Sequence, residues 1–427
     1  MNLKNLKDIY RLFLKYPAIT TDSRNCPENS LFFALKGVSF NGNHFAKEAI
    51  KRGCKYAFVD EEKFADNRNI FYVADSLKTL QQLAKKHRKT LKTIVIGITG
   101  TNGKTTTKEL IASVLKQKCR ILYTQGNLNN HIGVPLTLLQ LKKKDKIAVI
   151  EMGANHGGEI RELAEIAMPD YGLITNIGKA HLEGFGSFEG VIKAKGELYD
   201  YIRENQKKIF INHADGILGA ISEGIMKITY GTDKACCTKG KIRESEPFLS
   251  VEWNRKVIRT NLIGSYNFEN VLAAIAVGRY FDVPARRIVK ALESYMPEND
   301  RSQYKETEKN KIIIDAYNAN PTSMEASLSN FLQLSFPNKA VILGDMKELG
   351  EQSDKEHEKI VKILASEPSL SKVFLIGNCF KQTNSVFNTY ADVDEFLRWL
   401  QKNPVQDMMI LIKGSNSMNL KKVVDYL

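Results

Sequence analysis

Short apolar runs alternate with helix-length stretches along most of this chain of 427 residues. In the middle of the chain, apolar runs of strand length lie at 93–98, 147–150, 172–175 and 208–212. The same rhythm returns near the C-terminus, with runs at 311–314, 340–343, 373–376 and 409–412. Buried strands that alternate with helices are typical of βαβ units. The pattern therefore predicts an α/β fold with two separate parallel sheets.

The remaining segments have different patterns. Before residue 93, short strands are expected at 31–35, 56–59 and 70–73, and a last helix at 76–89. Residues 226–262 contain short alternating runs, which are typical of antiparallel strands, and a helix is expected at 267–280. Residues 294–300 break the periodicity and suggest a linker. We therefore expect three domains, at 1–92, 93–298 and 299–427.

The clearest chemical signal is the stretch TIVIGITGTNGKTTT at 93–107. It predicts a strand, a glycine turn and then a helix, with the helical pattern starting at Lys108. Backbone N–H groups between Gly100 and Thr105 can converge on phosphate oxygens, as in a P-loop. Lys104 would reach the outer phosphates, and the Thr105 hydroxyl would bind Mg²⁺. An ordinary glycine-rich turn is the alternative, since Ile98 stands where the common P-loop motif has glycine.

Polar residues follow two of the predicted central strands. Glu151 ends the run at 147–150, and His181 follows the run at 172–175. Ligands of open parallel sheets bind at the carboxyl ends of the strands, so both side chains are candidates for binding Mg²⁺. The alternatives are an exposed glutamate at a strand end and a structural histidine.

Lys195 has an unusual position on the predicted helix that starts at Phe188. It falls on the apolar stripe of that helix, whereas Lys193 falls on the polar face. Burial would lower the pKa of this lysine, and a neutral amine can react with CO₂ to give an anionic carbamate. Periodicity alone favours the other interpretation, in which Lys195 extends its ammonium group to solvent or pairs with a carboxylate.

Composition narrows the class of protein. Apolar residues make up 43% and charged residues 26%, as is ordinary for a globular protein. We expect no signal peptide, because the N-terminal stretch has no apolar region of about 7–15 residues. We also expect no membrane span, because no apolar run approaches about 20 residues. The six scattered cysteines form no CxxC pair and suit a reducing compartment. The net charge of +14 fits nucleic acid or polyanionic small molecules, and the absence of nucleic-acid-binding motifs favours the latter.

With these residues in view, the chain resembles the Mur ligases, the ATP-dependent amide-forming enzymes of peptidoglycan synthesis. The resemblance runs from TTDSR at 20–24 to KGS at 413–415. Its most specific motifs are EMGANHGGEI (151–160), AHLEGFGS (180–187), AKGE (194–197), DAYNANPTSM (315–324) and LGDMKELGEQS (343–353). They indicate the branch that joins D-alanyl-D-alanine to a UDP-N-acetylmuramoyl-tripeptide.

The resemblance implies an N-terminal domain for the UDP-sugar, a central ATPase domain and a Rossmann-like C-terminal domain. It implies two Mg²⁺ ions, one held by Thr105 and Glu151 and the other by Glu151, His181 and a carbamoylated Lys195. Lys104 would contact the transferred phosphate. The implied ATP-binding residues are Gly100, Thr101, Asn102, Gly103, Lys104, Thr105, Thr106, Asn267, Asn270, Arg301 and Asp315, and the implied substrate-binding residues are Asp22, Ser23, Arg24, Asn129, Asn130 and His131.

The expected enzyme is a cytoplasmic, ADP-forming ligase that acts as a monomer. A sibling ligase or a folylpolyglutamate synthase that adds a single amino acid is the nearest alternative. A P-loop ATPase that acts on a macromolecule and an inactive scaffold are more distant ones. The chain departs from the family pattern at Tyr266, where histidine is common, and at Asn416, where arginine is common.

Overall fold

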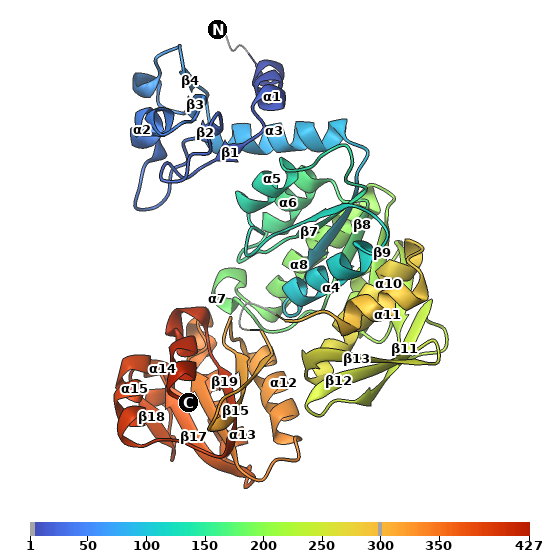
Figure 1. Ribbon diagram of the computed structural model, residues 1–427, viewed down its shortest axis with the longest axis vertical. Coiled ribbons are helices and arrows are strands. Elements are labelled where there is room, and N and C mark those ends of the chain that lie inside the picture. Colours follow the sequence, from blue (N-terminus) through green and yellow to red (C-terminus); the bar gives the residue numbers. More distant parts are fainter. Residues whose placement is uncertain (1–4, 298–300) are drawn as a thin grey trace.

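The computed structural model describes residues 5–297 and 301–427, and three β-sheets organise it (Figure 1). The predicted boundary between residues 298 and 299 lies outside the described residues. The first sheet has the order β1-β2-β3-β4, and all its strand pairs are parallel. Its strands are β1 (Ile19–Thr20), β2 (Leu31–Phe33), β3 (Tyr56–Val59) and β4 (Ile70–Tyr72).

Helices connect this first sheet to the rest of the molecule. The helix α2 (Ala46–Lys51) packs on one face, while α1 (Leu6–Lys15) and α3 (Ser76–Thr90) pack on the other. The long helix α3 also packs on α5 (Gly133–Leu138) and α6 (Glu159–Ala167) of the central domain. One apolar core therefore continues from the first sheet into the second.

The central sheet has nine strands in the order β13-β12-β11-β10-β9-β8-β5-β7-β6. They are β5 (Ile94–Thr99), β6 (Ile121–Tyr123), β7 (Ile147–Glu151), β8 (Tyr171–Ile174), β9 (Lys208–Asn212), β10 (Met226–Gly231), β11 (Thr238–Glu244), β12 (Phe248–Trp253) and β13 (Lys256–Ile263). Helices cover both faces of the parallel strands β5, β7, β8 and β9, so alternate side chains of these strands enter two different cores. One face carries α5, α6 and α8 (Phe188–Glu204), and the other carries α4 (Lys104–Leu115), α10 (Phe268–Tyr280) and α11 (Ala285–Glu293).

The third sheet has the order β14-β15-β19-β16-β17-β18, and only its edge strand β14 is antiparallel among the described pairs. The strands are β14 (Gln303–Glu306), β15 (Asn310–Asp315), β16 (Lys339–Gly344), β17 (Leu370–Ile376), β18 (Asn388–Tyr390) and β19 (Met408–Lys413). The helices α12 (Pro321–Leu332) and α13 (Ser353–Ala365) cover one face, and α15 (Val393–Lys402) covers the other.

The predicted α/β fold is confirmed, with differences in detail. The helix after the glycine turn begins at Lys104, so the predicted start at Lys108 was wrong. Gly103 adopts the left-handed conformation and ends the turn there, so the threonines form the first helical turn despite their modest helix propensity. In the 226–262 segment, β10 pairs parallel to β9, and antiparallel pairing begins only with β11 and β12. No helix of the described part of the chain is both long and apolar enough to cross a membrane.

Candidate nucleotide and metal site

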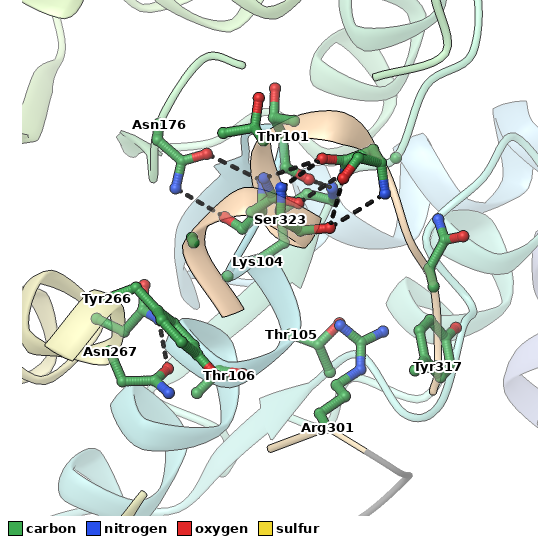
Figure 2. Close-up of a pocket in the computed structure, with 18 of the residues that line it drawn as sticks. Thr101, Lys104, Thr105, Thr106, Asn176, Tyr266, Asn267, Arg301, Tyr317 and Ser323 are labelled. Carbon is green, nitrogen blue, oxygen red and sulfur yellow. Dashed lines mark hydrogen bonds between the residues drawn. The ribbon is translucent and has the colours of Figure 1, made fainter. Parts of the chain in front are cut away.

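A cavity of about 990 Å³ lies where the carboxyl ends of the central strands face the C-terminal domain. Most of the predicted site residues line it: Thr101, Asn102, Gly103, Lys104, Thr105, Thr106, Asn129, Asn130, His131, Glu151, His181, Asn267, Asn270, Arg301 and Asp315. Figure 2 shows how part of this cavity is built from the loop before α4, the start of α10 and the first turn of α12. The topology thus gathers residues that lie far apart in the sequence.

The glycine loop has the geometry of a phosphate-binding turn. Gly100 has a φ of 141°, and a Cβ atom there would lie 2.0 Å from Oγ1 of Thr175, so only glycine fits. Lys104 begins α4, and its Nζ donates to the carbonyl oxygens of Gly100 at 2.7 Å and Thr101 at 2.9 Å. Burial lowers the pKa of Lys104 to about 8. The loop therefore presents a helix N-terminus and a cation to the cavity.

Glu151 is held beside the first turn of α4. Its carboxylate accepts hydrogen bonds from Oγ1 of Thr105 at 3.0 and 3.1 Å and from Nδ2 of Asn129 at 2.8 Å. A hydroxyl and a carboxylate in contact are the oxygen ligands that Mg²⁺ prefers, so these residues fit the implied metal. The fully buried Lys108, which sequence reasoning missed as a site residue, places its Nζ 3.7 Å from the same carboxylate.

Lys195 is buried in α8, at 2% exposure, whereas Lys193 is exposed. Its Nζ donates to the carbonyl oxygen of Ala154 at 3.3 Å and lies 5.1 Å from the centre of the Phe185 ring. Burial, aided by the charge of Lys104, lowers the pKa of Lys195 to about 7. Among the described residues it forms no ion pair, so neither an exposed ammonium group nor a carboxylate partner describes its surroundings.

His181 lies on the loop that precedes α7 (Leu182–Phe185), and it shares Phe185 as a neighbour with Lys195. The imidazole packs edge-on against the same Phe185 ring, with the ring centres 6.3 Å apart. Nδ1 of His181 lies 2.6 Å from Oε2 of Glu348, a residue of the C-terminal domain. Phe185 therefore contacts two of the implied metal ligands.

The residues predicted to lie on the adenine side pack beside the glycine loop and α4. Asn270 accepts a hydrogen bond from Oγ1 of Thr107 at 2.9 Å and donates to Asn267 at 2.9 Å. The hydroxyl of Tyr266, a residue that departs from the family pattern, lies 2.9 Å from Oγ of Ser302. The start of α10 is thus tied to both the loop and the C-terminal domain.

The C-terminal domain contributes charged and aromatic groups. The guanidinium of Arg301 lies 3.6 Å from the centre of the Tyr317 ring, and Asp315 accepts a hydrogen bond from Nζ of the buried Lys413 at 2.6 Å. Asn320 donates to Oδ1 of Asn102 at 2.8 Å, which joins α12 to the phosphate loop. Sequence reasoning did not assign Tyr317, Asn320 or Lys413, although the motifs DAYNANPTSM and KGS contain them.

The predicted substrate residues fall into two groups. Asn129, Asn130 and His131 line the cavity, and the carbonyl oxygen of His131 accepts a hydrogen bond from Gln81 of α3. Asp22, Ser23 and Arg24 follow β1 in the first sheet and do not line the cavity. Arg24 donates twice to the carboxylate of Asp22 and lowers the pKa of that group to about 2.

The family comparison covers most of the chain. The description "Mur ligase family, catalytic domain" matches residues 15–88, "Mur ligase middle domain" matches 98–278, and "Mur ligase, glutamate ligase domain" matches 300–416. The UDP-N-acetylmuramoyl-tripeptide–D-alanyl-D-alanine ligase of Bacillus subtilis is 34% identical, over 95% of this chain and 92% of its own length. The ligase of that name from Escherichia coli is 32% identical over 95% and 92%.

Solved structures agree with these relatives. A crystal structure of MurF from Acinetobacter baumannii has a TM-score of 0.84 and 31% identity, covering 96% of this chain and 92% of that one. MurF ligase from Thermotoga maritima, solved in complex with ADP, has a TM-score of 0.84 and 27% identity, covering 99% and 98%. A folylpolyglutamate synthase of Mycobacterium tuberculosis has a TM-score of 0.62 at 13% identity, which is a likeness of fold.

Proposed function

This chain belongs to the Mur ligase family, and we propose that it joins D-alanyl-D-alanine to a UDP-N-acetylmuramoyl-tripeptide at the expense of ATP, releasing ADP and phosphate. The observation that carries the proposal is the 34% identity to a ligase of that specificity over nearly the whole of both chains. The cavity supports it, because phosphate-binding, metal-binding and C-terminal groups meet there.

The chemistry explains why a phosphate loop is needed. A carboxylate is a poor electrophile, so the terminal carboxylate of the tripeptide must first be activated. An oxygen of that carboxylate attacks the γ-phosphorus of ATP, the bond to the ADP oxygen breaks, and an acyl phosphate forms. The amine of D-alanyl-D-alanine then attacks the acyl carbon, loses a proton, and displaces inorganic phosphate.

The residues of this chain have defined tasks in that reaction. The amide groups of Gly100 to Thr105 bind the phosphates, and Lys104 places its charge beside the transferred group. Thr105 and Glu151 would hold one Mg²⁺ ion, and Glu151, His181 and a carbamoylated Lys195 would hold a second. When bound, the two ions would neutralise the charge that develops on the transferred phosphate oxygens.

We further propose that Lys195 carries the carbamate. Nζ is buried, its pKa is lowered to about 7, and it contacts Phe185 and Ala154 rather than a carboxylate. A neutral amine attacks CO₂ through its lone pair, and loss of one proton leaves a carbamate anion. That reaction replaces a buried cation with an anionic oxygen ligand.

The proposal also covers the residues that would bind the UDP-linked substrate and the compartment in which the reaction takes place. Asn129, Asn130 and His131 would contact the muramoyl-peptide, and Asp22, Ser23 and Arg24 would bind the uridine end. The expected enzyme is a monomer of the cytoplasm, which suits six cysteines that are all free.

The decisive assay measures ADP release and the mass of the product. ATP and UDP-N-acetylmuramoyl-tripeptides containing either lysine or diaminopimelate would be supplied with D-alanyl-D-alanine, with single amino acids, or with neither. We expect a product carrying two added alanines, formed only with the dipeptide. ADP release with L-lysine, but not with D-alanyl-D-alanine, would assign the chain to a sibling ligase.

A further inference from the structure

The C-terminal domain touches the loop that carries His181 at several points. Lys179 donates from its backbone N–H to Oγ1 of Thr322 and from Nζ to Glu356, at 2.9 and 2.7 Å. The backbone N–H of Glu183 points to the carbonyl oxygen of Glu348 at 3.4 Å. In Figure 1, α7 reaches from the central sheet toward this domain. The loop is therefore an interface between domains as well as part of the cavity wall.

The contact between His181 and Glu348 stands out within this interface. Oε2 of Glu348 lies 2.6 Å from Nδ1 of His181. Nδ1 is buried and has no other hydrogen-bond partner within residues 5–297 and 301–427, so this carboxylate is the acceptor that lies beside it. Nε2 forms no hydrogen bond in the same ranges.

Both residues have an unusual backbone. His181 has a φ of 51° and Glu348 a φ of 64°, in the left-handed region that residues other than glycine seldom adopt. Such conformations persist where the surrounding structure enforces them, and they cluster at functional sites. Here they bring two side chains from different domains together.

We propose that Glu348 is a positioning residue of the metal site: its carboxylate, supplied by the C-terminal domain, orients His181 and holds the imidazole proton on Nδ1. Nε2 then keeps its lone pair for the metal, in the arrangement by which carboxylates commonly fix metal-binding histidines. The inference rests on the metal-binding role of His181 proposed above. It gives Glu348, in the motif LGDMKELGEQS, a task that ties metal binding to the docking of the C-terminal domain.

The test compares E348Q and E348A with the matched control E351Q. Glu351 is an exposed carboxylate nearby in the sequence, and it forms no ion pair among the described residues. Binding of Mn²⁺, measured by electron paramagnetic resonance with a non-hydrolysable ATP analogue, should weaken about 10-fold in E348A. The loss should be smaller in E348Q, because the amide oxygen can still accept a hydrogen bond from Nδ1. The control E351Q should match the wild type.

A second readout needs neither metal nor turnover. Nitrogen NMR of ¹⁵N-histidine-labelled, metal-free protein distinguishes the two imidazole tautomers, and an H181Q spectrum identifies His181 among the seven histidines. The wild type should show His181 protonated on Nδ1, and E348A should move that resonance while its melting temperature stays close to the wild-type value.

The outcomes separate this inference from the proposed function. An unchanged His181 resonance together with unchanged Mn²⁺ affinity in E348A would overturn the inference, and so would tighter Mn²⁺ binding. Wild-type protein that fails to ligate D-alanyl-D-alanine would instead overturn the proposed function, while the NMR comparison would still report on the contact between Glu348 and His181.

Discussion

Lys195 shows how much the position of one residue in a sequence pattern can indicate. Its place on the apolar stripe of a predicted helix indicated burial, and the side chain is 2% exposed. Periodicity could not say what surrounds Nζ, because Phe185 and Ala154 come from other segments of the chain. The helix pattern determines the face on which Lys195 lies. The neighbours of its amine are determined by how other segments of the chain pack there.

Replacement of Lys195 tests its role directly. K195A should lose activity about 100-fold or more, because it removes an anionic oxygen ligand of the proposed second metal. Added formate or acetate should restore part of the activity by supplying a carboxylate to the space left by the side chain. The exposed neighbour on the opposite face provides the control, and K193A should behave as the wild type. Absence of rescue, with metal binding unchanged, would count against the carbamate.

The lowered pKa of Lys195 predicts how carbamate formation depends on pH. Only the neutral amine reacts with CO₂, and with a pKa of about 7 that form predominates above pH 7 and is lost below it. With ¹³C-bicarbonate, a carbamate carbon signal should therefore appear at about pH 8 and fade toward about pH 6. The signal should be missing in K195A. A signal that appears only near pH 10, as for an exposed lysine, would show that burial does not activate this amine.

At the scale of elements, the apolar runs predicted the buried strands well. They predicted the short edge strands and the first residue of α4 less well. Strands buried on both faces read as continuous apolar runs, so β5, β7, β15, β16 and β19 were recognised from the sequence. The edge strands β6 and β18 have only three residues each and were missed. The start of α4 was placed too late, because three threonines obscured a helix that the left-handed Gly103 begins at Lys104.

The N-terminus of α12 is an element whose two functions can be separated. The Asn320 side chain accepts a hydrogen bond from the Ser323 N–H as the N-cap, and its amide also donates to Asn102 of the phosphate loop. N320A should destabilise the C-terminal domain by about 1 kcal/mol, while N320D should keep the cap and most of the stability. Denaturant unfolding followed by Trp399 fluorescence in a W253F background measures this difference. Equal destabilisation in both variants would contradict the cap.

At the scale of the whole molecule, the fold gathers the site from segments that lie far apart along the chain. The residues after β5, β7 and β8 meet because they follow parallel strands of one sheet, as the sequence predicted. Glu348, Tyr317 and Lys413 could not be placed in the same way, because their position depends on how the C-terminal domain docks. Asp22, Ser23 and Arg24 lie in the first sheet, outside the cavity.

The net charge of +14 also acts at this scale. A cationic protein attracts a polyanionic substrate at long range, and dissolved salt weakens this attraction by screening the charges. The KM for the UDP-linked tripeptide should therefore rise several-fold between about 50 mM and about 300 mM salt, while the KM for zwitterionic D-alanyl-D-alanine changes little. Steady-state kinetics at constant magnesium would measure both values. Equal salt dependence for the two substrates would show that the charge does not serve substrate capture.

The central claim is that one cavity holds the triphosphate of ATP between the glycine loop and the side chains of Glu151 and His181, which follow neighbouring strands. The most direct measurement is a crystal structure of this protein with Mg²⁺ and a non-hydrolysable ATP analogue. We expect the terminal phosphate beside Lys104, one metal ion on Thr105 and Glu151, and a second reached by His181. A triphosphate that lies far from Glu151 and His181 would contradict the account.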